Sequence, residues 1–276
     1  MNTLKARRIY LHAITPLHSG TGQAADVVDL PIAREKATGW PVVPASSLKG
    51  TLRDGRKDDE ANKLFGAPEF AAPISFTDLR LLCLPVRSFY GTFAWVSSPL
   101  ALERFARDGE ALGAGVEWAA ANLNVAEENA LVASKKPLTQ GETLYLEDLN
   151  LSAREDSRVS TIAQGLAAEV FGGANESFVQ RFAVVSNAVF DFLCETATEI
   201  VARVALKEES KTVRDGGLWY EEAVPAEAIF TGWAVDTGYK PEDAAVAWQK
   251  LEGERVIQIG GNATVGRGLC RLVVKP

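Results

Sequence analysis

The order in which strand-like and helix-like segments follow one another constrains the fold of this chain more than any other feature. Alternating apolar residues predict strands, and apolar residues three and four apart predict helices. The predicted strands are 8–14, 74–86, 89–96, 143–151, 199–206, 224–235, 255–259 and 269–274. The predicted helices are 44–53, 58–65, 99–107, 117–122, 159–171 and 242–251, and 182–196 is predicted to be a strand that passes into a helix. This irregular mixture favours an α+β fold with a largely antiparallel sheet.

The chain has no internal repeat and no stretch with the composition of a linker, so we predict that residues 1–276 form one domain. Hydrophobic residues make up 47% and charged residues 24% of the sequence, as in ordinary soluble globular proteins. No segment approaches the roughly 18 apolar residues that a membrane-spanning helix needs. Residues 1–8 are polar and basic and lack the apolar core of a signal peptide. We therefore expect a cytoplasmic protein without a membrane partner.

Three cysteines, Cys83, Cys194 and Cys270, lie far apart in apolar runs. Their odd number and wide spacing predict buried thiols in a reducing compartment, not disulfides. Because the chain has only two histidines, it also offers few ligands for a structural zinc ion.

Residues 15–53 form the stretch that is most informative about function. They have no regular apolar period, and Gly20 and Gly22 free the backbone for turns that a side chain would forbid. Long irregular segments in compact domains are usually functional or disordered, and the apolar residues scattered through this one predict an ordered loop. It contains two aspartates, Asp26 and Asp29, and one of the two histidines, His18.

Asp29 lies between Val28 and Leu30, an apolar setting that favours a fixed position, whereas Asp26 follows two alanines and is expected to be more exposed. A carboxylate beside a phosphodiester can bind a divalent metal ion or take a proton from a hydroxyl group. The structural alternative is an aspartate that stabilises a turn. His18 likewise has a catalytic and a structural interpretation. A serine or cysteine triad has little support, because both histidines lie in the first strand and the following loop.

The helix predicted from residue 44 carries a second candidate site. Ser46 or Ser47 is expected to cap its free backbone N–H groups, and helix N-termini bind anions through these groups. Lys49, Arg53 and Arg56 follow on one face. Phosphate binding is one interpretation, and a capped surface helix with a solvated basic face is the other.

A glycine-rich loop at 260–268 separates the last two predicted strands. Its spacing nearly matches a P-loop, but Arg267 replaces the lysine, Gly268 replaces the hydroxyl residue, and a strand follows where a helix should begin. A nucleotide-hydrolysing P-loop is therefore not expected. Glycines around an arginine still let backbone amides and a guanidinium approach phosphates; a strained hairpin is the alternative. The candidate contacts are Gly260, Gly261, Asn262, Gly266, Arg267 and Gly268.

A charged segment at 207–222 lies between the predicted strands 199–206 and 224–235, which we expect to pair. It contains Lys211, Arg214, Trp219 and Tyr220. Aromatic residues in a mobile basic hairpin can stack against bases, although the same aromatics can instead fill the core. The formal net charge of −7 argues against a nucleic-acid partner unless the cations gather in one groove.

Four segments, taken together and in this order, resemble the signature segments of the RAMP proteins of CRISPR systems. They are TPLHSGTG at 15–22, VVDLPIAREKATGWPVVPASSLKGTLRD at 27–54, LWYEEAVP at 218–225 and IQIGGNATVGRGL at 257–269. The similarity is greatest to the backbone subunits of type III-B (Cmr) effector complexes. No matching motif lies in residues 113–171.

The resemblance implies a ferredoxin-like, RRM-related core with inserted fingers and a thumb hairpin near 204–224. It implies copies stacked head to tail along a CRISPR guide RNA, other effector-complex subunits as partners, and cleavage of complementary target RNA at regular intervals with a divalent metal ion, Mg or Mn. Asp29 matches the family's cleavage residue and would bind the metal, and His18 or Glu222 would assist. Lys49 matches a guide-RNA contact, residues 260–268 match the family's glycine-rich loop, and residues 207–222 match the thumb.

Two other functions remain open at this point. The same scaffold can bind guide RNA without cutting, as related backbone subunits of other CRISPR types do. An unrelated metabolic enzyme that binds a nucleotide at the glycine-rich loop is the third possibility.

Overall fold

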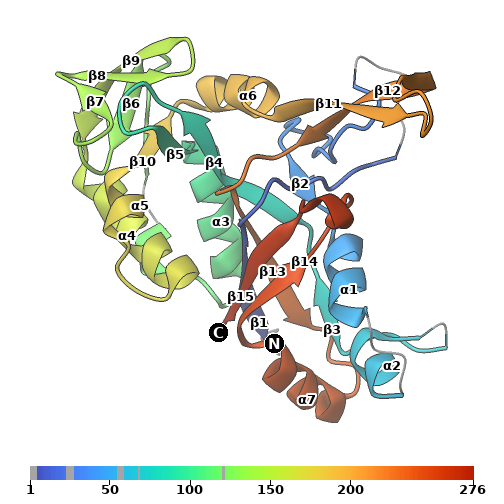
Figure 1. The fold of residues 1–276 in the computed structure, drawn as a ribbon. Helices are drawn as coiled ribbons and strands as arrows, with labels where there is room; N and C mark the ends of the chain where they lie inside the picture. Colours follow the sequence, from blue (N-terminus) through green and yellow to red (C-terminus); the bar gives the residue numbers. More distant parts are fainter. Residues whose placement is uncertain (1–4, 23–27, 55–58, 68, 120–121) are drawn as a thin grey trace.

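The computed structural model describes residues 5–22, 28–54, 59–67, 69–119 and 122–276 (Figure 1). The helices are α1 (Ala45–Arg53), α2 (Asp59–Phe65), α3 (Pro99–Ala111), η1 (Glu117–Ala119), α4 (Ser157–Phe171), α5 (Glu176–Gln180), α6 (Asn187–Thr196), α7 (Pro241–Leu251) and η2 (Ala263–Val265). The strands are β1 (Ala6–Ala13), β2 (Val42–Val43), β3 (Ile74–Phe76), β4 (Leu79–Arg87), β5 (Phe93–Ser97), β6 (Asn129–Val132), β7 (Thr139–Gln140), β8 (Thr143–Leu146), β9 (Leu149–Glu155), β10 (Phe182–Val185), β11 (Glu199–Leu206), β12 (Val213–Ala223), β13 (Ile229–Asp236), β14 (Gly253–Gln258) and β15 (Leu269–Lys275).

One large sheet runs through the molecule in the order β14-β15-β1-β13-β4-β5-β10-β6-β9-β8-β7, with β2 beside β4 and β3 beside β13. Its strand pairs are antiparallel except β5 with β10 and β6 with β9. The predicted α+β class with a mainly antiparallel sheet is therefore confirmed. At one end of the sheet, β15, β1, β13 and β4 lie side by side, and α1 and α7 lie in the connections of these strands (Figure 1).

Both sides of strand β1 are buried. Tyr10 lies 5.9 Å from Phe105 of α3 between ring centroids, and His12 lies 5.1 Å from Phe171 of α4, so α3 and α4 pack against the same face of β1. Helices α1, α2 and α7 pack against one another elsewhere, through side chains such as Leu52 and Leu251. All three cysteines are buried and free, as predicted. Among the described residues, no helix combines the length and apolar character needed to cross a bilayer.

Most predicted elements are present, but several boundaries differ. The segment predicted as one strand at 74–86 is broken at Thr77–Asp78 into β3 and β4, and the segment at 143–151 is a hairpin of β8 and β9. The strand predicted at 89–96 starts only at Phe93. In the described part of the Ala-rich segment at 117–122, three residues form a 3-10 turn where a helix was predicted.

The pairing predicted for the strand 199–206 is wrong. Its partner is β12, which occupies most of the charged segment, while β13 pairs with β1 and β4 inside the large sheet. The hairpin β11–β12 forms a separate sheet that projects from the body (Figure 1). Its alternating apolar residues point outward, not into the core: Ile200, Val204, Leu206, Val213, Leu218 and Tyr220 are all exposed. We call these six residues the apolar stripe.

Candidate functional site

Asp29 is fixed against the base of the hairpin. The backbone of Leu30 donates to the carbonyl of Tyr220 at 3.1 Å, and the N–H of Glu222 donates to the carbonyl of Leu30 at 3.0 Å, so this segment runs along β12. The Asp29 carboxylate accepts a hydrogen bond from the Tyr220 N–H at 2.8 Å. Asp29 is half-buried, and a backbone donor of strand β12 sets its position.

Glu222, two residues further along β12, is only 6% exposed. Its carboxylate accepts hydrogen bonds from Arg34 at 2.5 Å, from the Thr198 hydroxyl at 2.9 Å and from the Ile32 N–H at 3.1 Å. These contacts tie the loop that follows Asp29 to the hairpin. We call these contacts the clamp at Glu222, because they fix the position of the Asp29 segment relative to β12.

His18 contacts the same edge of this strand end. Its Nδ1–H donates to the carbonyl oxygen of Glu222 at 2.6 Å, and the side chain is 7% exposed. Because a carbonyl can only accept, the proton lies on Nδ1, which leaves Nε2 as the basic atom of the neutral ring. A Cβ at Gly20 would lie 2.5 Å from Nε2, and one at Gly261 would lie 3.0 Å from Cδ2. The two glycines therefore make the space that the imidazole fills.

The glycine-rich loop closes over this histidine. Gly261 donates its N–H to the His18 carbonyl at 2.8 Å. Gly260 has a φ of 83°, and a Cβ there would lie 2.4 Å from the same carbonyl oxygen. Arg267 is 8% exposed and pairs with Glu199 at 3.5 Å. The loop thus packs on His18, and the Arg267 side chain is turned into the protein.

Glu221 is a central residue of the site that the sequence analysis did not single out. It is 4% exposed and accepts hydrogen bonds from Trp219 Nε1 at 2.8 Å, Arg203 at 3.1 Å and Asn262 Nδ2 at 2.9 Å. Burial raises the pKa of its carboxyl, but the hydrogen bonds from Trp219 and Arg203 outweigh burial and hold that pKa below its usual value. Glu221 therefore stays ionised and joins the glycine-rich loop to the hairpin. The sequence signal that could have pointed to this role is its place in the LWYEEAVP segment at 218–225, next to Glu222.

The predicted serine caps of α1 are wrong. The residue before the helix is Pro44, and Ser46 and Ser47 lie inside the first turn without capping it. The carboxylate of Asp78 instead accepts the Ala45 N–H at 2.8 Å. An acidic side chain from a distant loop therefore already occupies part of the predicted anion site.

The basic residues after this helix start have different environments. Lys49 is half-buried on α1. Arg53 donates to the Gly66 carbonyl at 3.1 Å and to Asn62 at 2.6 Å, which joins α1 to the loop after α2. Arg56 lies outside the described residues.

The tip of the hairpin holds the other predicted RNA contacts. Lys211 has a φ of 55° in the turn, and Arg214 donates to the Leu206 carbonyl at 3.1 Å. Both side chains are exposed. Trp219 is half-buried at the base of the hairpin through its bond to Glu221.

The arrangement brings Asp29, His18 and Glu222 together from three separate segments. It does not form a group of three metal-ligating side chains among the described residues. A single carboxylate is nevertheless a sufficient protein ligand for Mg²⁺, which usually keeps several waters and takes its other oxygens from substrate phosphates. Within the part of the chain that the structure describes, the Asp29 carboxylate accepts from Tyr220 alone and keeps further lone pairs, so its donor set fits such an ion.

Comparison with known proteins identifies the family of the chain. The sequence profile of the RAMP superfamily matches residues 10–271. A relative from Pyrococcus furiosus, named CRISPR system Cmr endoribonuclease Cmr4, is 35% identical over 289 residues that cover 99% of this chain and 96% of the relative. The solved structure of oligomeric Cmr4 from Pyrococcus furiosus has a TM-score of 0.76 at 30% identity and covers 98% of both chains. A chain of the type III-B Cmr-beta complex bound to cognate target RNA matches in fold, with a TM-score of 0.77 at 22% identity over 98% of this chain and 96% of that chain.

Proposed function

The chain belongs to the RAMP superfamily, and on that premise we propose that it is the backbone endoribonuclease subunit of a type III-B CRISPR effector complex. In this role it binds guide RNA and cuts complementary target RNA at regular intervals. The observation that carries the proposal is the position of Asp29, which the Tyr220 N–H holds at the base of a projecting hairpin. We treat residues 1–276 as one RAMP domain, which the match over 10–271 supports.

The proposed reaction uses the target RNA's own 2′-hydroxyl as the nucleophile on the adjacent phosphorus. The bond between the 2′-oxygen and phosphorus forms, the bond from phosphorus to the 5′-oxygen of the next nucleotide breaks, and that oxygen leaves with a proton from water. DNA lacks the 2′-hydroxyl and is spared. Asp29 would orient the scissile phosphate and would hold a divalent metal ion, Mg or Mn. When bound, such an ion supplies charge stabilisation at the phosphoryl oxygens. His18, whose Nδ1–H is bound to the Glu222 carbonyl, accepts or relays the hydroxyl proton at Nε2. Glu222 acts as a positioning residue through its contacts with Arg34 and Ile32.

RNA binding is proposed for three surfaces. The start of α1 with Ser46, Ser47 and Lys49 contacts guide phosphates, and the exposed backbone of the glycine-rich loop contacts the ribose–phosphate strand next to His18. The hairpin is the thumb, and Lys211 and Arg214 at its tip face the RNA. Because Arg53 and Arg267 are paired within the protein, their contribution to this binding is to position the surfaces.

Within the α+β class, we propose a more specific fold. The order β15-β1-β13-β4, with α1 and α7 in the connections, supports a ferredoxin-like core. The strands β6 to β10 are then the inserted fingers. We also propose a cytoplasmic location, which the three buried free thiols support.

Self-association is proposed to use the apolar stripe. A two-stranded sheet in isolation is only marginally stable, and exposed contiguous apolar surface usually marks a contact. A hairpin on one side of the body that meets a different surface of the next copy gives a head-to-tail, open assembly. The relative from Pyrococcus furiosus with a similar fold has been solved as an oligomer.

A non-catalytic scaffold is the second candidate. It is favoured by the observation that both oxygens of Glu222 accept hydrogen bonds within the protein. The deciding experiment assembles the effector complex with Asp29→Ala and, as the control, with Asp148→Ala in the exposed turn between β8 and β9. Loss of target cutting in Asp29→Ala alone, with guide RNA still bound, supports the nuclease. Cutting that persists in Asp29→Ala supports the scaffold.

A further inference from the structure

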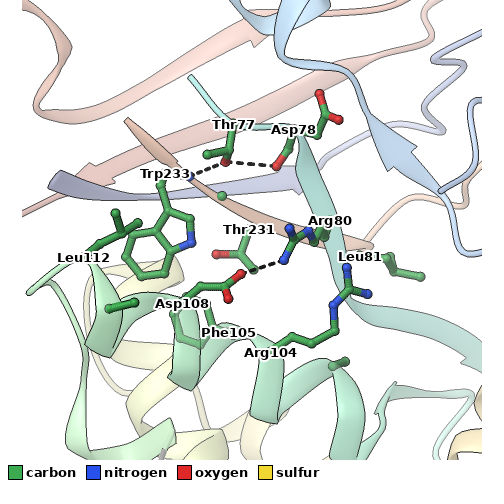
Figure 2. Close-up of a pocket in the computed structure, with 13 residues that line it drawn as sticks. Thr77, Asp78, Arg80, Leu81, Arg104, Phe105, Asp108, Leu112, Thr231 and Trp233 are labelled. Carbon is green, nitrogen blue, oxygen red and sulfur yellow. Dashed lines mark hydrogen bonds and ion pairs between the residues drawn. The ribbon is translucent and has the colours of Figure 1, made fainter. Parts of the chain in front are cut away.

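A cavity of about 210 Å³ lies between helix α3 and the strands β4 and β13. None of the residues assigned to RNA cleavage lines it. Helix α3 contributes one wall, and the two strands with the turn before β4 contribute the others (Figure 2). The residues that carry the argument are Asp78, Arg80, Phe105, Asp108, Thr231 and Trp233.

One wall of the cavity is flat, apolar and rigid. The rings of Trp233 and Phe105 are nearly parallel, at 17°, with their centroids 5.6 Å apart, and each residue is at most 5% exposed. Gly109 lets α3 approach the indole closely, because a Cβ there would lie 2.9 Å from Cη2 of Trp233. A planar ring can lie against such a wall without moving it.

The other side of the cavity presents hydrogen-bonding groups. The indole nitrogen of Trp233 is turned toward the cavity (Figure 2), and within the part of the chain that the structure describes it has no acceptor. Arg80 and Asp108 face it and form an ion pair of 2.6 Å, and the second carboxylate oxygen of Asp108 accepts from the exposed Arg107 at 3.1 Å. The cavity thus offers two donors, an indole N–H and a guanidinium, next to one acceptor carboxylate.

The Arg80 guanidinium remains paired even when Asp108 turns to a ligand. Arg80 also contacts Glu35 at 3.3 Å, and Arg104 holds Glu35 through two hydrogen bonds of 2.7 and 2.9 Å. Burial raises the pKa of Glu35, but the hydrogen bonds from Arg104 and Thr38 outweigh it and keep that pKa low. Glu35 is therefore ionised and available to neutralise Arg80.

We propose that this cavity binds a guanine base. The edge of guanine carries the N1–H and N2–H donors beside the O6 acceptor, which matches a carboxylate next to two donors. The carboxylate of Asp108 accepts from N1 and N2, and Arg80 and the Trp233 indole donate to O6 and N7. The ring lies against the Trp233–Phe105 wall, and the cavity volume holds one purine.

The place of the cavity connects it to RNA. Asp78 lines the cavity and accepts the Ala45 N–H, so the cavity adjoins the start of α1. Ser46, Ser47 and Lys49 lie on that first turn, where we propose phosphate contacts. A nucleotide whose phosphate lies there has its base within reach of the cavity. The guanine could belong to an RNA or to a free nucleotide, since both offer the same ring. That it belongs to RNA rests on the proposed function.

The test measures binding of GMP and AMP to the full chain by calorimetry. Asp108→Asn keeps the size of the side chain but places an amide N–H₂ against the donors of guanine. Its matched control is Glu110→Gln, an exposed residue of the same helix outside this cavity, which removes the same charge. We expect GMP to bind about tenfold more tightly than AMP, and Asp108→Asn to lose about tenfold in GMP affinity. Glu110→Gln should stay within about twofold of the unmodified protein.

A second variant covers the case in which Asp108→Asn fails to fold. Trp233→Phe removes the indole N–H while it keeps an aromatic ring against Phe105, and we expect it to weaken GMP binding by about threefold to tenfold. Equal binding of GMP and AMP, no binding of either, or unchanged GMP affinity in both variants would overturn the proposal.

Short single-stranded RNAs separate this inference from the proposed function. An all-uridine RNA reports RNA binding in general, and the same RNA with one guanosine reports the cavity. A gain in affinity from the guanosine that disappears in Asp108→Asn assigns the base to RNA. GMP binding without such a gain assigns the cavity to a free nucleotide. If uridine RNA binds but neither GMP nor the guanosine adds affinity, the cavity assignment fails and RNA binding stands.

Discussion

The backbone N–H of Tyr220 donates to the Asp29 carboxylate at 2.8 Å, although the two residues are 191 positions apart in the sequence. The contact couples the acidic side chain to the register of β12. Any change that shifts this strand end by one residue would also remove the donor that aims Asp29. The cleavage chemistry proposed here is therefore set by how the hairpin joins the body.

Position 260 requires glycine for two reasons: its φ is positive, and a side chain there would collide with the His18 backbone. Gly260→Ala must accommodate a Cβ 2.4 Å from the His18 carbonyl oxygen, whereas Gly266→Ala has the same left-handed φ, 81° against 83°, with no atom within 4 Å. We expect Gly266→Ala to cost about 1–2 kcal/mol of unfolding free energy and Gly260→Ala about 1–3 kcal/mol more. Chemical denaturation of both variants measures the difference, and equal losses would contradict the close packing of the loop on His18.

Removal of the Glu221 charge should loosen the glycine-rich loop in a pH-dependent way. Since the folded pKa of Glu221 is depressed, its ionised form stabilises the fold above its ordinary pKa of about 4.3, and this stabilisation is lost as the pH falls. Glu221→Gln should therefore be less stable than the unmodified protein by about 1–3 kcal/mol at neutral pH. The gap should narrow below about pH 4. Denaturation curves at several pH values test this, and a gap that widens toward acid pH would refute the role given to the carboxylate.

The apolar stripe should control assembly. Val204→Lys places a charge in the stripe, and Val256→Lys places one at a similarly exposed position of β14, 58% exposed against 52% for Val204. We expect Val204→Lys to reduce the number of copies assembled on guide RNA and Val256→Lys to leave it unchanged, because only the first residue belongs to the proposed contact. Sedimentation velocity with a guide RNA of fixed length measures the stoichiometry. Normal assembly of Val204→Lys would exclude the stripe as the contact between copies.

Glu222 should affect the cutting rate because it positions the segment that carries Asp29, and not because it transfers a proton. Glu222→Gln keeps one acceptor oxygen, which can face the Thr198 hydroxyl and Arg34, but it loses the charge paired with Arg34 and places an amide N–H₂ against the Ile32 N–H. We expect a loss in cutting rate of about tenfold or less, with an unchanged pH dependence of that rate. Single-turnover cutting by the assembled complex at several pH values is the measurement. A loss of cutting that depends on pH would make Glu222 an acid–base residue instead.

The sequence predicted those features whose causes are local. The bounds of β11 agree with its alternation, and the glycine stop after α4 is a left-handed residue, Gly172, at a φ of 76°. The return strand was missed because charged residues and two adjacent glycines interrupt β12 between Val213 and Leu218, so its apolar alternation is short.

The errors at the site come from contacts between distant residues. The serines of α1 fit the pattern of a cap, but the acceptor is Asp78, which is 33 positions from the donor, Ala45. The importance of Glu221 depends on Arg203 and Asn262, which reach it from a neighbouring strand and from the glycine-rich loop. No spacing rule relates such residues, since the fold alone brings them together.

The most direct test of the account replaces Asp29 by asparagine in the assembled effector complex. Asparagine can still accept the Tyr220 N–H, so the geometry at the strand end is kept while the charge that binds metal and orients the phosphate is lost. We predict that single-turnover cutting of a complementary target RNA falls by about 100-fold or more, with guide and target binding unchanged. Cutting by Asp29→Asn at the rate of the unmodified complex would contradict the central claim that this carboxylate carries out the cleavage.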